Sequence, residues 1–315
     1  MSLAAVFPGQ GAQSVGMLAE IAQEHPSVQA RFAEASDHLG FDLWKLSQDG
    51  PAEQLALTEN TQPVLLTASV ALWDVWRAQF EARGLLVADE VAFMAGHSLG
   101  EYSALVCAEA MSFADGVKLV RRRGELMEAA VPAGEGGMAA IMGLDDEAIQ
   151  AACDQADGVV EPANFNAPGQ TVIAGAAAAV QQAADLCKEA GAKRTVVLEV
   201  SGPFHSPLMS AAKEEFAQAL AATEVDMPNI PVVQNVTATV AASVESLQQN
   251  LVQQIAAPVL WAKSVQYMVE QGVDTFVECG PGGVLSGLIR RISKPTPTLG
   301  TSTPDALAKA VAIEL

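Results

Sequence analysis

Short apolar runs alternate with longer amphipathic segments along almost the whole chain. Residues 3–7 (LAAVF) and 91–95 (VAFMA) each end at a glycine-containing turn, which is typical of buried strands. Between them, residues 63–80 carry the longer apolar pattern of a helix, and another helix is expected over about 99–110. This alternation predicts an α/β fold.

The middle of the chain has a different rhythm. Its expected elements are a strand at 138–143, a helix at 145–156, strands near 159–165 and 170–174, a helix at 176–190 and a strand at 194–200. The order β-α-β-β-α-β is that of a ferredoxin-like unit. We therefore predict a small domain at residues 132–200, inserted into a large domain formed by residues 1–131 and 201–315.

Composition narrows the possible partners. The 315 residues include 37 acidic and 17 basic ones, and the formal charge is −20. Such a chain lacks the basic footprint that nucleic acid or an anionic membrane surface requires. It has neither a signal-peptide pattern nor an apolar stretch long enough to span a membrane, and its four cysteines are widely spaced. We expect a cytoplasmic protein with free thiols.

Ser98 is the first candidate for chemistry. It lies in Gly96-His97-Ser98-Leu99-Gly100, where an expected strand ends and an expected helix begins. A nucleophilic serine requires this strand–turn–helix setting, and the helix supplies backbone N–H groups, including that of Leu99, to a developing oxyanion. The alternative is a glycine-rich turn with an ordinary N-cap serine.

A serine hydroxyl needs a base, and the chain has four histidines. His25 and His38 lie in polar helical stretches, and His97 adjoins Ser98, where its side chain is expected to support the turn. His205 remains, in a loop before a helix with Ser206 as N-cap and Pro207 at its first position. The N-terminus of that helix should favour the neutral imidazole that a base needs. A lone loop histidine is more often structural, but this elimination makes His205 the candidate base.

Arg123 is the third candidate. At about 100° per residue, the helix expected over 113–131 turns Arg122 away from its apolar stripe and places Arg123 beside Leu119 and Leu126. A half-buried arginine needs an anionic partner. That partner is either a carboxylate of the protein or a carboxylate of the substrate, and the sequence leaves the choice open.

Two glycine-rich segments are less specific. Gly9-Gln10-Gly11 matches neither the dinucleotide fingerprint nor the P-loop, and Gly280-Pro281-Gly282-Gly283 is expected to be a structural turn. No group of histidine, cysteine and carboxylate residues has metal-ligand spacing, so no metal is expected.

Taken together, these segments resemble the bacterial malonyl-CoA:acyl carrier protein transacylases over essentially the whole chain. The matching motifs are FPGQGAQ (7–13), TQPVLLTASVAL (61–72), AGHSLGEYSAL (95–105), RRGELM (122–127), NFNAPGQTVIAG (164–175), GPFHSPLM (202–209) and ECGPGGVLSGL (278–288). Each motif alone is weak, but their order and spacing are specific.

The resemblance implies a role for each matching residue. Ser98 corresponds to the acylated serine, His205 to its base and Arg123 to the arginine that binds the substrate carboxylate. Further roles fall on residues that spacing alone does not identify: Gln10 and the N–H of Leu99 in the oxyanion hole, Gln254 with a backbone carbonyl that orients the histidine, and Phe204 as a bulky residue that favours malonyl. The implied architecture is an α/β-hydrolase-like large domain carrying the ferredoxin-like insert.

The implied activity is transfer of a malonyl group from coenzyme A to the phosphopantetheine thiol of acyl carrier protein in fatty-acid biosynthesis. It would be a ping-pong reaction through malonyl-Ser98, without a cofactor, since the coenzyme A thioester is a substrate. A serine hydrolase such as a thioesterase could use the same Ser98 and His205, but its histidine usually follows an acidic partner late in the chain. A degenerate binding module is the other alternative.

The acidic composition conflicts with two acidic partners, coenzyme A and acyl carrier protein. We therefore expect a local basic rim near the cleft. Its candidates are Lys188, Lys193, Arg194, Arg290, Arg291 and Lys294.

Overall fold

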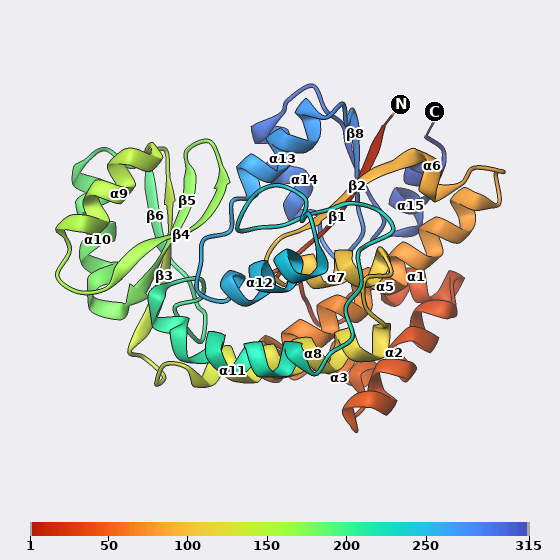
Figure 1. Ribbon diagram of the computed structural model, residues 1–315, viewed down its shortest axis with the longest axis horizontal. Coiled ribbons are helices and arrows are strands. Elements are labelled where there is room, and N and C mark those ends of the chain that lie inside the picture. Colours follow the sequence, from red (N-terminus) through yellow and green to blue (C-terminus); the bar gives the residue numbers. More distant parts are fainter. Residues whose placement is uncertain (1, 314–315) are drawn as a thin grey trace.

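Two separate sheets organise the chain, and the computed structural model describes residues 2–313 (Figure 1). The large sheet has the order β7-β2-β1-β8-β9, and all of its strand pairs are parallel. Its strands are β1 (Leu3–Phe7), β2 (Val91–Gly96), β7 (Val232–Val233), β8 (Thr275–Glu278) and β9 (Thr298–Gly300). The central position of β1 explains its apolar sequence, because every one of its residues is buried.

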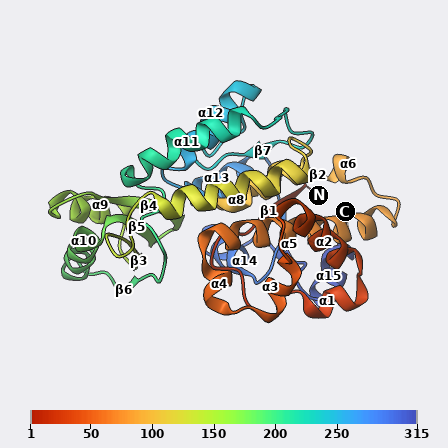
Figure 2. The same ribbon diagram turned by 90° about the horizontal axis from the view of Figure 1, so that it is seen from below.

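Helices cover the large sheet and supply most of its core. Three of them matter for the site: α5 (Thr58–Glu81), α7 (Leu99–Cys107) and α8 (Phe113–Ala129). The others in this part are α1 (Ala19–Glu24), α2 (Ser27–Leu39), α3 (Leu43–Asp49), α4 (Ala52–Ala56), α6 (Val87–Glu90), α11 (Ser210–Ala221), α12 (Val244–Gln254), α13 (Trp261–Glu270), α14 (Val284–Ile292) and α15 (Pro304–Val311). Seen from below, α8 runs beside α11, with α1 to α4 grouped on the other side of α8 (Figure 2).

The long helix α5 anchors this part of the molecule. Trp73, Trp76 and Phe80 follow one another at helical spacing, are buried, and pack as successive aromatic pairs. Burying one such ring contributes about 1.5–3 kcal/mol. The helices that surround the site are therefore held by a large, rigid core.

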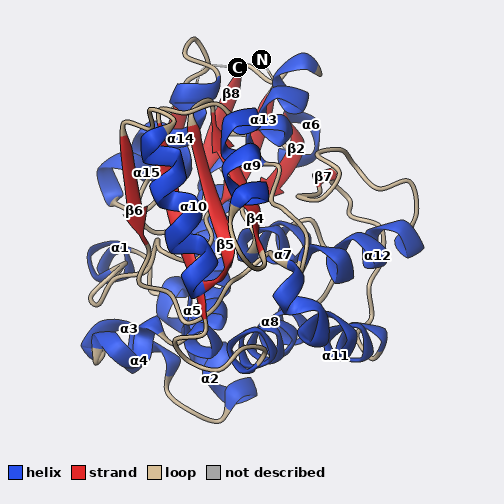
Figure 3. Ribbon diagram, turned by 90° about the vertical axis from the view of Figure 1, so that its left-hand side faces the viewer, coloured by secondary structure: helices blue, strands red, loops and turns tan. Residues whose placement is uncertain are grey.

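The small sheet is antiparallel and has the order β4-β5-β3-β6. Its strands are β3 (Gly136–Met142), β4 (Val160–Ala167), β5 (Gln170–Ala176) and β6 (Arg194–Val197). Two helices, α9 (Asp146–Gln155) and α10 (Ala177–Glu189), cover one face (Figure 3). Together they enclose a separate apolar cluster that includes Ile141, Ile149 and Ile173. The expected succession β-α-β-β-α-β is present.

The structure corrects three expected boundaries. Strand β6 ends at Val197 instead of residue 200, although the Leu198 N–H still donates to the Met138 carbonyl oxygen at 2.9 Å. Leu198 and Val200 line a cavity described below. The sequence also predicts a strand over 231–236, but only Val232–Val233 form one. The helix expected from 207 begins as a short 3₁₀ turn, η1 (Pro207–Met209), before α11. None of the helices within residues 2–313 combines the length and apolar character needed to cross a membrane.

Candidate active site

Ser98 occupies a strained elbow between β2 and α7. Its backbone has φ 50° and ψ −104°, a region that residues with a side chain rarely adopt. Although Ser98 precedes the first helical residue, its side chain makes no capping hydrogen bond. The hydroxyl is therefore free of the structural task that an ordinary N-cap serine performs.

The two flanking glycines, Gly96 and Gly100, allow close approach of the backbone and do not carry the strain of the turn. Neither Gly96 nor Gly100 has a positive φ, so the strain lies on Ser98 itself. The glycines are needed for close approach: a Cβ on Gly96 would lie 1.9 Å from the backbone carbon of Gly100, and one on Gly100 would lie 2.0 Å from the carbonyl oxygen of Phe7. The missing side chains let α7 start directly against the ends of β1 and β2.

His205 lies against the serine. Its Nε2 is 2.7 Å from Ser98 Oγ, and its Nδ1 is 2.7 Å from the backbone carbonyl oxygen of Gln254. Because a carbonyl can only accept, Nδ1 carries the proton and Nε2 is left to accept from the serine. His205 is buried and, like Ser98, has a positive φ, 60°. Strain of this kind collects at functional sites.

The electrostatic setting keeps the imidazole neutral. Burial, and secondarily the charge of Arg123, lowers the pKa of His205 to about 3. The helix terminus that the sequence suggested as the cause is only a 3₁₀ turn, and the Ser206 hydroxyl donates to Pro203 instead of capping it. Burial therefore replaces a helix terminus as the reason that His205 can act as a base.

Arg123 forms no ion pair with an aspartate or glutamate in the part of the chain that the structure describes. It is 1% exposed on α8, whereas its neighbours Arg121 and Arg122 are partly exposed and pair with glutamates. Arg123 donates through Nη1 to Gln62 Oε1 at 2.9 Å and through Nη2 to Gln254 Oε1 at 2.9 Å and Ser98 Oγ at 3.1 Å.

No carboxylate lies at ion-pair distance from Arg123 within residues 2–313, and its Nε has no hydrogen-bond partner among them. Tyr102 lies beneath the guanidinium, with its ring centre 5.1 Å from Cζ. The sequence left open whether Arg123 pairs with a carboxylate of the protein or of the substrate. The structure favours the substrate, because a buried cation without a carboxylate beside it is prepared for an anionic ligand.

A cavity of about 110 Å³ joins these groups. It is lined from both parts of the chain, including Gln10, Ser98, Leu99, Arg123, Met138, Asn164, Leu198, Val200, Phe204 and His205. Leu99 is the first residue of α7, so its N–H has no acceptor within the helix. The Gln10 amide lies at the same cavity, 3.4 Å from Thr58 Oγ1. The structure brings together every site residue expected from the sequence.

The remaining histidines take no part in this pair. His97 Nε2 lies 2.7 Å from Asn166 Oδ1, while its carbonyl accepts from Gly100, so His97 supports the elbow as expected. His25 contacts Gln79, and His38 is exposed on α2.

Two buried polar residues were absent from the sequence reasoning. Asn235 Oδ1 accepts from the Ser98 N–H at 2.7 Å, and Asn235 Nδ2 donates to Gly96 at 2.7 Å, so one amide bridges the elbow. Glu101, one turn after Ser98, accepts from the Asn235 N–H and from Gln254 Nε2. Glu101 and Asn235 are 134 positions apart in the sequence, so no local pattern predicts their contact.

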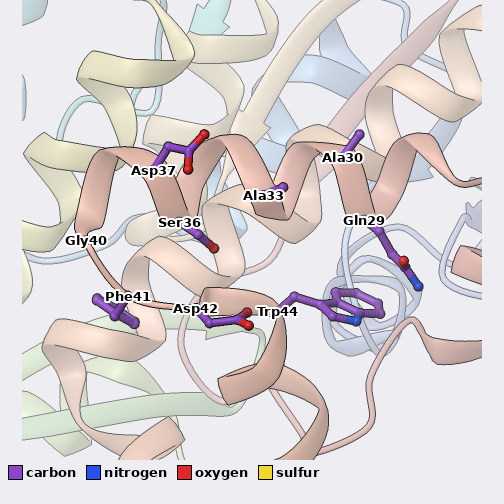
Figure 4. Close-up of a pocket in the computed structure, with 9 residues that line it drawn as sticks. All are labelled: Gln29, Ala30, Ala33, Ser36, Asp37, Gly40, Phe41, Asp42 and Trp44. Atoms are coloured by element: carbon purple, nitrogen blue, oxygen red, sulfur yellow. The ribbon is translucent and has the colours of Figure 1, made fainter.

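A larger hollow of about 760 Å³ lies elsewhere, between α2 and the loop before α3 (Figure 4). Its lining includes Asp37, Asp42 and Trp44, but it shares no residue with the Ser98 cavity. Size alone therefore does not identify the reactive site. Within residues 2–313, no group of three or more histidine, cysteine or acidic side chains is arranged to hold a metal ion.

Comparison with known proteins places this geometry in a family. The acyl transferase domain family matches residues 5–304. A curated relative from Salmonella typhimurium, described as malonyl CoA-acyl carrier protein transacylase, is 52% identical over 97% of both chains. A solved structure of the protein so described from Coxiella burnetii has a TM-score of 0.95 and 44% identity, and covers 99% of this chain and 97% of that one.

A further solved structure has a TM-score of 0.94 and 47% identity over 99% of both chains, and is described as a type II PKS acyl-carrier protein in complex with its malonyl-transacylase. Likeness at this identity and coverage extends over both sheets and the elbow. The chain belongs to the acyl transferase family, among its bacterial malonyl CoA-acyl carrier protein transacylases.

Proposed function

We propose that this chain transfers a malonyl group from coenzyme A to the phosphopantetheine thiol of acyl carrier protein, through an ester on Ser98. The observation that carries the proposal is the contact of Arg123 Nη2 with Ser98 Oγ at 3.1 Å. A buried guanidinium beside the nucleophile suits an acyl group that ends in a carboxylate. The names of the relatives described above support the same substrate and partner.

The first half-reaction follows from the hydrogen bonds. Ser98 Oγ–H donates to His205 Nε2, which takes the proton as Oγ attacks the thioester carbonyl. The Oγ–C bond forms, and the oxyanion lies between the Leu99 N–H and the Gln10 amide. When the C–S bond breaks, the coenzyme A sulfur leaves with the proton from His205.

The second half-reaction runs the same path in reverse. The phosphopantetheine thiol gives its proton to His205 as its sulfur attacks the malonyl-serine ester, and Ser98 recovers its proton as the Oγ–C bond breaks. The Gln254 carbonyl stabilises the imidazolium that forms in both halves, because it accepts from Nδ1 at 2.7 Å. No cofactor is needed, since the coenzyme A thioester is a substrate.

A hydrolase using Ser98 and His205 is less well supported. Hydrolases of this type orient the histidine with a carboxylate, whereas His205 Nδ1 meets a backbone carbonyl. A non-catalytic binding module does not account for a serine within hydrogen-bond distance of both a neutral imidazole and a cation.

Replacing Arg123 tests the proposal. Arg123→Ala removes the group that pairs with the malonyl carboxylate, so kcat/KM for malonyl transfer should fall about 10- to 100-fold. Acetyl transfer should survive or rise, because an acetyl group has nothing to pair with the guanidinium. Arg122→Ala, a partly exposed neighbour, is the matched control and should change neither rate. Equal losses of malonyl and acetyl transfer in Arg123→Ala would contradict the proposal.

The proposal extends to architecture and location. We assign the antiparallel β-α-β-β-α-β unit, residues 132–200, to a ferredoxin-like domain and residues 1–131 and 201–315 to an α/β-hydrolase-like domain, with a cytoplasmic setting. Phe204 is buried and lines the cavity, and we assign to its ring the exclusion of branched acyl chains.

We also assign docking of the acidic partners to exposed basic residues beside the small sheet. Arg291 Nη1 donates to Gln170 Oε1 at 2.7 Å. At the same end of the sheet, the Gly143 N–H donates to the Gly169 carbonyl oxygen, and the Lys193 N–H donates to the Met142 carbonyl oxygen. Lys193, Arg194 and Arg291 thus gather at one end of that sheet. Lys188 stands apart in an ion pair with Asp185 on α10. None of the basic residues expected at the rim is among those lining the Ser98 cavity. A basic rim near the cleft stays a prediction, for which Lys193, Arg194 and Arg291 are the candidates.

A further inference from the structure

Glu101 is a fully buried carboxylate that the reaction described above does not use. It lies in the first turn of α7 and is 0% exposed. Its Oε2 accepts from the Asn235 N–H at 2.8 Å and from Gln254 Nε2 at 2.9 Å, and its Oε1 accepts from Gln234 Nε2 at 3.3 Å. All three partners are donors, so the arrangement suits the ionised carboxylate.

Gln254 links Glu101 to the reactive groups. Its amide has a donor end and an acceptor end. The donor end, Nε2, contacts Glu101 and the Ser98 carbonyl oxygen, while the acceptor end, Oε1, accepts from Arg123 Nη2. If the amide turned over, Nε2 would face the guanidinium donor and the contact with Arg123 would become repulsive.

We propose that Glu101 is a positioning residue that fixes the orientation of the Gln254 amide and thereby presents Arg123 to the carboxylate of the substrate. The side chain of Gln254 carries this effect to Arg123, while its backbone carbonyl holds His205. Glu101 thus selects for a carboxylate-bearing acyl group more than it promotes attack by Ser98.

The separation of the two charges supports this assignment. A direct pair between Glu101 and Arg123 would occupy the donors that a substrate carboxylate needs. With the Gln254 amide between them, Glu101 remains a nearby counter-charge for a buried cation and leaves the guanidinium open to the cavity. Burial raises the pKa of Glu101 to about 7, although its hydrogen-bond donors and the charge of Arg123 act to lower it. The raised pKa reflects the free-energy cost of keeping an ionised carboxylate at this buried position.

The test is a double-mutant cycle between Glu101→Ala and Gln254→Ala, read as kcat/KM for malonyl-CoA and acetyl-CoA. Glu101→Ala should lower malonyl transfer at least about tenfold and change acetyl transfer less than about threefold. In the Gln254→Ala background, the same change should alter malonyl transfer less than about threefold, because the relay is already gone. Glu101→Gln should restore most malonyl transfer, since its Oε1 can accept where Oε2 does.

Exposed Glu214→Ala is the matched control, and Glu101→Leu repeats the test without leaving a cavity if the alanine variant does not fold. Equal losses for malonyl and acetyl, or a full tenfold loss that persists in the Gln254→Ala background, would overturn the assignment. The inference rests on the proposed function, but the two fail separately. Wild-type protein that takes up no malonyl group contradicts the function, whereas only the pattern among variants contradicts the role of Glu101.

Discussion

Strain and burial meet at Ser98 and His205. Each holds a positive φ, and holding a residue with a side chain there costs on the order of 1–3 kcal/mol. The Asn235 amide offsets this at the elbow by accepting from Ser98 and donating to Gly96. At His205, the Gln254 carbonyl offsets the strain by accepting a hydrogen bond from Nδ1 of the imidazole. The catalytic pair is thus preorganised before substrate arrives.

The neutral state of His205 can be observed directly. Since burial and Arg123 lower its pKa to about 3, the imidazole should not titrate between about pH 5 and pH 8. Carbon-13 NMR of the labelled imidazole, assigned with a His205→Ala variant, measures this. A His205 signal that titrates near the unperturbed value of 6.5 would show that the ring is less buried or less influenced by Arg123 than described.

At this scale the sequence predicts residues whose role follows from local pattern. Arg123 is predicted by helical phase, and Ser98 by the strand–turn–helix context. The roles of Gln10 and Gln254 rest on resemblance, and Glu101 and Asn235 were not predicted. Glu101 reaches Gln254 across 153 positions, and only the folded chain brings such partners together.

The junction of β1, β2 and α7 is the element that carries the nucleophile. A Cβ on Gly100 would lie 2.0 Å from the Phe7 carbonyl oxygen, on the backbone of the central strand, which cannot move aside. The missing side chain at this point determines how far the start of α7 advances over the sheet.

Gly100→Ala should therefore destabilise the protein by about 3 kcal/mol and abolish acylation, because α7 must shift. Gly287→Ala is the matched control: that glycine lies in α14 with no atom within 4 Å of its added Cβ, so the change should stabilise by about 0.5–1 kcal/mol. Urea unfolding of both variants measures the difference. Similar free energies of unfolding for the two would refute the close-approach argument.

Element identity was predictable where periodicity is strong, as for α5, α8 and the small-sheet unit. Short, partly exposed elements were not predicted: β9 has three residues, all only partly buried, and its pairing with β8 is decided by tertiary contact. The end of β6 was predicted three residues too late, in a segment where Leu198 and Val200 line the cavity. Apolar sequence cannot distinguish a residue in a sheet from one that faces a substrate.

The whole molecule should carry a pH signature of Glu101. Burial raises its pKa from 4.5 to about 7 in the folded state, so the folded protein binds this proton more tightly than the unfolded chain. Its favourable contribution is present below about pH 4.5 and is lost as pH rises through about 7. His205 acts in the opposite direction below pH 6.5, because its pKa is lowered on folding.

Comparing Glu101→Gln with wild type isolates the glutamate. Between about pH 5 and pH 8, the free energy of unfolding should decline less for Glu101→Gln than for wild type. The difference between the two declines should be on the order of 1–3 kcal/mol. Chemical denaturation at each pH provides the measurement, with Glu214→Gln as the exposed control. Parallel pH profiles for wild type and Glu101→Gln would mean that the carboxylate is not in the buried setting described.

The net charge of −20 also belongs to the scale of the whole molecule. It disfavours anionic partners in general, so we propose that productive encounter with coenzyme A or acyl carrier protein relies on local basic residues, with Lys193, Arg194 and Arg291 as the candidates. Two strands of the small sheet and the loops and helices around the large sheet together line the cavity in which Arg123, Ser98 and His205 meet. Transfer between two thiols is the chemistry that this shared site supports.

The central claim is that Ser98 carries the malonyl group between two thiols. The direct measurement is mass spectrometry of the intact protein after brief exposure to malonyl-CoA, followed by peptide mapping and a chase with the thiol form of acyl carrier protein. We expect one added malonyl group on Ser98, none on Ser98→Ala, and faster discharge to the thiol than to water. No adduct on Ser98, or discharge to water as fast as to the thiol, would contradict it.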